Sequence, residues 1–147
     1  MKTYEIQLNS GKTVTLRLTS RALSSYIKEH GLPGAAPLVS VMNAVNDMDA
    51  LIALLSAAMR YPGSVVDKEL ATGAELLDAL ADEDKGDVYI KGLVVQLARD
   101  AGLVDDQGAK DLADAAGANS AQLVSKIAAL LRLDGVEEEA QEEENPT

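Results

Sequence analysis

The fold is decided by residues 3–20, TYEIQLNSGKTVTLRLTS. Apolar and polar residues alternate in two short runs on either side of residues 9–12. Side chains of a strand alternate between its faces, so each run predicts a strand with one apolar face. The four residues between the runs tolerate positive φ, as a hairpin loop requires. A lone hairpin is only marginally stable, so this face must pack on helices. The face consists of Tyr4, Ile6, Leu8, Val14, Leu16 and Leu18.

Two short helices are expected after the hairpin. Thr19 or Ser20 can cap the first, and Gly31 is expected to stop it in a left-handed conformation. Pro37 suits the first position of the second helix, because the missing N–H of proline has no partner there in any case. The apolar residues that share a face are Ala22, Leu23, Tyr26 and Ile27 in the first helix and Leu38, Val41, Met42 and Val45 in the second.

A third helix is predicted to be the most buried element of the chain. Asn46 or Asp47 can cap it, and Pro62 and Gly63 end it. It is apolar on nearly every side, which is typical of the central helix of a bundle. The helical spacing also places three methionines in the core, although they could instead form an adaptable binding surface. These are Met42, Met48 and Met59.

Two further helical regions precede a break in the sequence at Gly102. The first is expected to begin with Val65, Val66 and Leu70, and after it Thr72 and Glu75 have the spacing of a capping box. The second contains Gly92, which either marks close packing or simply weakens the helix.

The character of the sequence changes after Gly102. We therefore divide the chain into a hairpin and helical domain (1–104), a helical extension (105–135) and an acidic tail (136–147). The tail has little to bury and many like charges, so it is expected to be disordered. An apolar stripe in the extension is expected to serve either as a lid on the core or as an arm that binds a partner. It consists of Leu123, Val124, Ile127, Leu130 and Leu131.

Composition agrees with a compact, mainly helical protein. The 147 residues are 47% apolar and include neither Trp nor Phe, so Leu, Ala, Val, Ile and Met must build the core. Leu and Ala are strong helix formers. The predicted fold class is therefore α+β, mainly α: an N-terminal β-hairpin packed on a bundle of about five to seven short helices, followed by the disordered acidic tail.

Several functional classes are disfavoured by the residues that are missing. The chain has no cysteine, which excludes disulfides, thiolate metal sites and cysteine nucleophiles. It has no apolar run of about 18 residues and no basic leader followed by apolar residues, so we expect no membrane contact and a cytoplasmic location. A net charge of −11 disfavours binding to nucleic acid.

Enzymatic chemistry is not expected either. His30 is the only histidine and falls in the last turn of a helix, where the helix dipole favours a cation, so a capping or surface role is expected. The acids that begin at Asp82 fail as a calcium loop, because Gly86, Asp87 and Leu93 occupy positions that need other residues. We therefore predict no catalytic residue, no cofactor and no metal.

The order of elements in the first two-thirds of the chain follows a known pattern. The hairpin runs into LTSRAL (18–23), the chain breaks at Gly31, a new helix starts at PL (37–38), and another starts at TGAELLD (72–78) before Gly102. This order resembles that of the tail assembly chaperones of long-tailed (siphovirus-type) bacteriophages and prophages.

The resemblance implies a function and its partners. Such a chaperone binds and solubilises the tape measure protein and helps recruit tail-tube subunits, in many cases through a frameshift-extended form. It works in the cytoplasm of the bacterial host and is not expected in the mature virion, and self-association is compatible with this role. An acidic helical body suits the task, since apolar grooves cover amphipathic helices while net charge opposes aggregation. The alternative is a small acidic helical adaptor or regulatory scaffolding protein.

Overall fold

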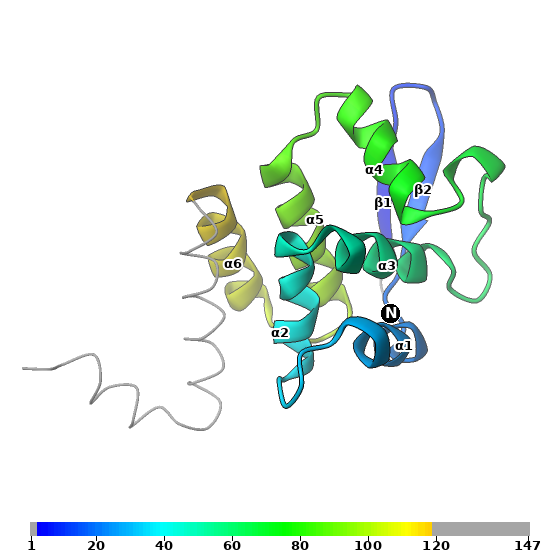
Figure 1. The fold of residues 1–147 in the computed structure, drawn as a ribbon. Coiled ribbons are helices and arrows are strands. Elements are labelled where there is room, and N and C mark those ends of the chain that lie inside the picture. Colours follow the sequence, from blue (N-terminus) through cyan, green and yellow to red (C-terminus); the bar gives the residue numbers. More distant parts are fainter. Residues whose placement is uncertain (1–2, 119–147) are drawn as a thin grey trace, which may run out of the picture.

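The computed structural model describes residues 3–118 (Figure 1). In this part of the chain a two-stranded hairpin is followed by six α-helices and two short 3-10 segments, which confirms the predicted α+β, mainly α class. The acidic tail predicted for 136–147 lies outside the described residues.

The hairpin forms as its alternating pattern predicts. Strands β1 (Tyr4–Gln7) and β2 (Thr13–Leu16) pair antiparallel, with Ile6 opposite Val14. Gly11 adopts a φ of +91° in the loop, a conformation that favours glycine. One face of the hairpin is buried against the helices, and its buried residues are Ile6, Leu8, Val14, Leu16 and Leu18.

Helix α1 (Ser20–His30) begins as predicted but ends differently. The Thr19 hydroxyl accepts a hydrogen bond of 3.1 Å from the N–H of Ala22 and so caps the helix. Gly31 does not supply the predicted left-handed stop, since its φ is −69° and its backbone is extended. Its N–H still bonds to the carbonyl of Ile27, so the last turn is closed before the chain leaves in an extended direction.

The predicted second helix divides into two segments. Helix α2 (Pro37–Met42) has Pro37 in its first turn, and a 3-10 segment, η1 (Asn43–Asn46), follows it. The prediction of one helix through Val45 was wrong because the chain tightens into 3-10 geometry at its end, as helix ends commonly do. The Tyr26 hydroxyl donates a hydrogen bond of 2.8 Å to the carbonyl of Ser40 and thereby joins α1 to α2.

Helix α3 (Met48–Met59) is the central element, as predicted. Asp47 caps it by accepting a hydrogen bond of 3.2 Å from the N–H of Ala50. It packs against α1, α4 (Gly73–Asp82), η1 and β2 (Figure 1). The N–H of Arg17 donates a hydrogen bond of 2.8 Å to the carbonyl of Ala58, which fixes the end of the hairpin on this helix.

Within residues 3–118 no single helix is long and apolar enough to cross a membrane. The segments 37–46 and 48–59 reach that length and composition only as a pair, and the pair is bent by 120°.

The helix predicted to begin at Val65 does not form. Val65 is 94% exposed in a loop, and the first turn after it is a 3-10 segment, η2 (Lys68–Leu70). Two adjacent valines are poor helix formers. Asp67 also bonds to the N–H of Glu69 at 2.8 Å, which favours a local turn over a continuous helix.

Helices α4 and α5 (Asp87–Asp100) are joined by a tight turn. Thr72 caps α4 through the N–H of Glu75, as the capping-box spacing predicted. At the other end the N–H of Lys85 bonds to the carbonyl of Leu80, and Asp84 has a φ of +59°. This is a Schellman ending with an aspartate in the position that glycine usually fills.

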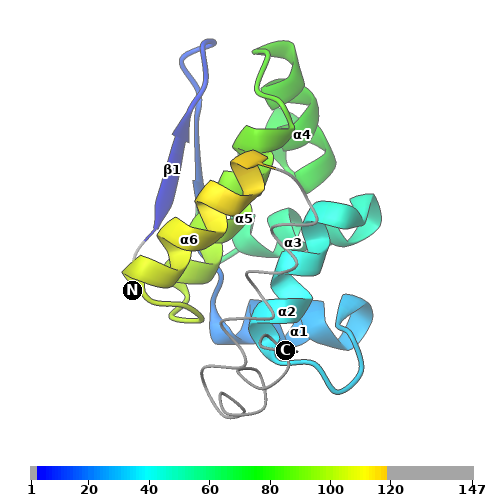
Figure 2. The same cartoon turned by 90° about the vertical axis from the view of Figure 1, so that its left-hand side faces the viewer.

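Helix α6 (Asp106–Ala118) runs back along α5 (Figure 2). Asp105 caps it by accepting a hydrogen bond of 2.7 Å from the N–H of Gly108. Arg99 forms an ion pair of 2.6 Å with Asp106 across the connection. The hydrophobic core continues into this helix through Ala109, Leu112 and Ala115.

Candidate functional site

An open groove of about 610 Å³ lies between the η1–α3 junction, α4 and the start of α5. We call it the α3–α4–α5 groove. Its wall is mostly aliphatic, so it suits an apolar side chain better than a small polar ligand. The apolar residues that line it are Ala44, Val45, Met48, Leu51, Ile52, Ala74, Leu77, Ala81 and Ile90.

Helix α4 builds one wall because it carries two apolar faces. Leu76 and Leu80 are fully buried in the core. Leu77 and Ala81 are four positions apart on the neighbouring face and line the groove. A helix that needed only to cover the core would have polar residues on this second face.

Met48 is the one large apolar side chain of the groove lining that is mostly exposed. It is the first residue of α3, directly after the cap at Asp47, and it is 63% exposed. The prediction that all three methionines pack in the core is therefore wrong for Met48, whereas Met42 and Met59 are buried as predicted. A long, flexible thioether at the mouth of a groove adapts to different partner side chains.

Charged residues surround the groove. Asp47, Asp78 and Asp87 contribute acids, while Lys85 and Lys91 contribute bases. Lys91 is almost fully buried and forms an ion pair of 2.7 Å with Asp87. The Lys85 ammonium lies 5.0 Å from the centre of the Tyr89 ring. The rim is therefore polar with a slight excess of acid, around an apolar interior.

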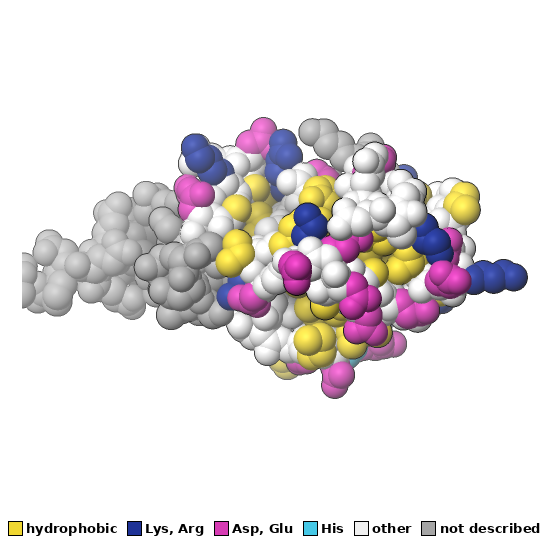
Figure 3. Space-filling view, turned by 90° about the horizontal axis from the view of Figure 1, so that it is seen from above, with side chains coloured by type: hydrophobic (Ala, Val, Ile, Leu, Met, Phe, Trp, Pro, Cys, Tyr) yellow, Lys and Arg dark blue, Asp and Glu magenta, His cyan; other side chains and the backbone are white. Residues whose placement is uncertain are grey.

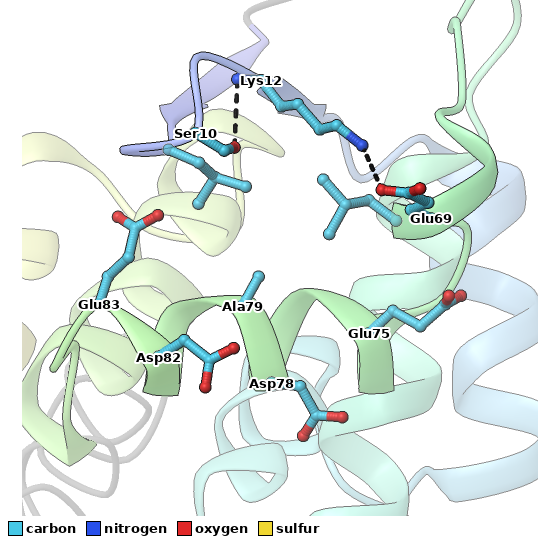
Figure 4. A pocket seen from close by; sticks show the side chains of 10 residues that line it. Ser10, Lys12, Glu69, Glu75, Asp78, Ala79, Asp82 and Glu83 are labelled. Atoms are coloured by element: carbon cyan, nitrogen blue, oxygen red, sulfur yellow. Dashed lines mark hydrogen bonds and ion pairs between the residues drawn. The ribbon is translucent and has the colours of Figure 1, made fainter.

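A second, more polar cleft of about 430 Å³ lies between the hairpin loop and α4 (Figure 4). Lys12 spans part of it and forms ion pairs with Glu69 at 2.7 Å and Asp67 at 3.2 Å. The Glu83 carboxylate accepts a hydrogen bond of 2.8 Å from the N–H of Asn9. The two ion pairs raise the pKa of Lys12, first through Glu69 and then through Asp67.

The acids around this cleft hold the hairpin in place. The pKa of Asp67 is lowered first by the hydrogen bond from the N–H of Glu69 and then by the Lys12 ammonium. Asp78 and Asp82 point away from the hairpin, so the acids do not converge on one point (Figure 4). Within residues 3–118 no group of three or more His, Asp or Glu side chains is placed to hold a metal ion.

His30 lies at the end of α1, where its ring stacks on that of Tyr26 with 5.8 Å between centroids. It is partly exposed and lies outside both the groove and the cleft. The structure therefore places the single histidine against a core tyrosine.

The predicted partner-binding stripe and the groove are different parts of the chain. The stripe, Leu123, Val124, Ile127, Leu130 and Leu131, lies outside the described residues, so its role stays a prediction. Sequence reasoning missed the groove. The adjacent leucines at 76 and 77 do not by themselves predict an open face, because two adjacent residues of a helix can both be buried, as Leu54 and Leu55 are in α3.

A space-filling view from above shows hydrophobic side chains that reach the surface among acidic ones (Figure 3). Comparison of the chain with models of protein families, with curated proteins and with solved structures gives no match.

Proposed function

We propose that this protein is a phage tail assembly chaperone that binds amphipathic helical segments of the tape measure protein and keeps them from aggregating. The observation that carries the proposal is the α3–α4–α5 groove, whose aliphatic lining comes mostly from η1, α3 and α4. An amphipathic helix buries its apolar side in a groove of this kind.

Two further features support the proposal. The arrangement of a hairpin followed by helices agrees with the family that the sequence resembles. The net charge of −11 would make coated complexes repel one another and so oppose their aggregation. If the groove faces the bound tape measure segment, most of the acidic residues stay on the outer surface of the complex.

The proposal is tested by co-expression with fragments of a tape measure protein encoded in the same genome. We expect the intact chain to keep an otherwise insoluble fragment in solution. Met48→Glu places a charge at the groove mouth and should weaken binding at least about tenfold, because the burial of one such side chain contributes about 1.5–3 kcal/mol.

Val65→Glu is the matched control for this substitution. Val65 is 94% exposed and does not line the groove, so the variant carries the same added charge without touching the site. Equal binding by both variants would show that the groove is not the contact surface. A genome in which no tape measure or tube gene lies nearby would instead favour the adaptor alternative.

A further inference from the structure

The α3–α4–α5 groove has a candidate occupant within the chain itself. Residues 119–133, NSAQLVSKIAALLRL, follow α6 directly and lie outside the described part of the chain. The apolar stripe defined above recurs there at i, i+1, i+4, i+7 and i+8, the spacing of one helical face. We propose that this stripe occupies the groove of the same molecule.

The path of the chain supports this placement. Helix α6 packs antiparallel to α5, so its C-terminal end lies beside the first turns of α5 (Figures 1 and 2). Those turns contribute Asp87, Ile90 and Lys91 to the groove. The chain from Ala118 to Leu123 can span up to about 17 Å when it is extended. A linker of this length joins the stripe to the end of α6 that lies beside the groove-lining turns of α5.

Charge also favours this segment over the rest of the C-terminal region. The segment carries Lys126 and Arg132 and no acid, in a chain that is otherwise strongly acidic. The groove rim contributes three aspartates and two lysines, and one of the lysines is already paired with Asp87. A weakly basic segment thus meets a weakly acidic rim, whereas the glutamate-rich sequence after it would be repelled.

A second copy of the chain could supply the same stripe, but attachment to the same molecule favours the internal arrangement. A short tether holds its segment at an effective concentration of the order of millimolar. The inference concerns the isolated chain and does not rest on the proposed function. It has a regulatory consequence, because any partner helix that uses the groove must displace this segment.

A nitroxide label on Ser125→Cys tests the placement in the full-length chain. The natural sequence has no cysteine, so the label is attached at a single position. Ser125 falls opposite the apolar stripe in helical spacing, and the label does not replace a groove contact. We expect the methyl signals of Ile52, Leu77 and Ile90 to lose most of their intensity, while those of Val65 stay sharp.

Two further samples decide between explanations. The charged variant Leu130→Glu/Leu131→Glu, labelled at the same cysteine, should recover the groove signals. Equal broadening in this variant would mean that mere tethering causes the effect and would overturn the proposal. A mixture of labelled and isotope-enriched chains should show no broadening, and broadening there would assign the groove to a second copy. Sharp groove signals in the first sample would also overturn the proposal.

Discussion

The N–H of Gly73 donates a hydrogen bond of 2.8 Å to the hydroxyl of Ser56 at the crossing of α3 and α4. The same hydroxyl donates one of 2.7 Å to the carbonyl of Ile52, so Ser56 links the start of α4 to the backbone of α3. A Cβ on Gly73 would collide with that carbonyl and press on Leu55. The absence of a side chain at Gly73 therefore sets how closely the two helices approach.

Gly73→Ala should lower the free energy of unfolding by about 1–3 kcal/mol, the usual cost of forcing an extra carbon into a packed contact. Gly92→Ala is the matched control in α5, because no atom lies near the Cβ that it would add. This control should raise the free energy of unfolding by about 0.5–1 kcal/mol, since alanine favours helix over glycine. Urea unfolding of the two variants measures both effects. Equal destabilisation by both would contradict the packing argument.

Asp84→Gly should stabilise the protein by about 0.5–1 kcal/mol. Asp84 ends α4 with a φ of +59°, a left-handed conformation that strains residues with a Cβ. Glycine removes that strain and keeps the backbone hydrogen bonds of the turn. Thermal unfolding measures the change, and Asp82→Gly in the last turn of α4 is the control that should destabilise instead. A lower melting temperature for Asp84→Gly would refute this explanation.

Leu112→Ala should lower the free energy of unfolding by about 2–5 kcal/mol, because it opens a cavity where α6 packs on α5. The main transition of the whole chain should shift, since Leu112 belongs to the same hydrophobic cluster as the core of the hairpin and helices. Urea titration followed by circular dichroism measures it. A separate early transition, with the main one unmoved, would instead make 105–135 an independent unit.

Stability should fall between pH 10 and 12 because of Tyr26. Burial raises its pKa from 10.0 to about 12, and Asp47 adds to the effect. Below pH 10 the hydroxyl is protonated in both the folded and the unfolded protein, so Tyr26 makes its full contribution to the free energy of unfolding there. Above pH 10 only the unfolded state ionises, which costs on the order of 2–3 kcal/mol by pH 12.

Tyr26→Phe provides the comparison for this alkaline loss. At pH 8 the variant should be about 1 kcal/mol less stable, since it lacks the hydrogen bond to Ser40. The variant lacks the ionisation of Tyr26, so the advantage of the natural protein should vanish above pH 10, and the variant should be the more stable of the two at pH 12. A constant difference over that range would rule out Tyr26 as the titrating group.

Local signals in the sequence predicted the elements whose hydrogen bonds are local. The hairpin alternation and the caps at Thr19, Asp47 and Thr72 all depend on residues within a few positions of each other. Gly31 was predicted wrongly because the chain after α1 makes a non-local contact, in which the N–H of Leu32 bonds to the hydroxyl of Ser40. The loop at Val65 had a local signal that the prediction overlooked, namely two adjacent valines and the turn at Asp67.

The groove could not be predicted from any one segment. It exists because side chains of η1, α3, α4 and α5 converge, which depends on the close approach of α3 and α4 at Gly73 and on the turn at Asp84. Met48 illustrates the difficulty, since its spacing is that of a core residue and only the arrangement of α4 and α5 leaves it uncovered.

The hairpin is held by two kinds of force that respond oppositely to salt. Aliphatic burial anchors one face of the hairpin from Leu18 to Leu8, while the loop is also held at the surface by Lys12 with Asp67 and Glu69. Dissolved ions screen the surface pairs, and sulfate in particular strengthens apolar burial. A concentrated sulfate solution would therefore loosen the ion pairs of Lys12 while it strengthens the burial of the apolar face of the hairpin. The loop and the apolar face of this one element would thus respond in opposite directions to the same salt.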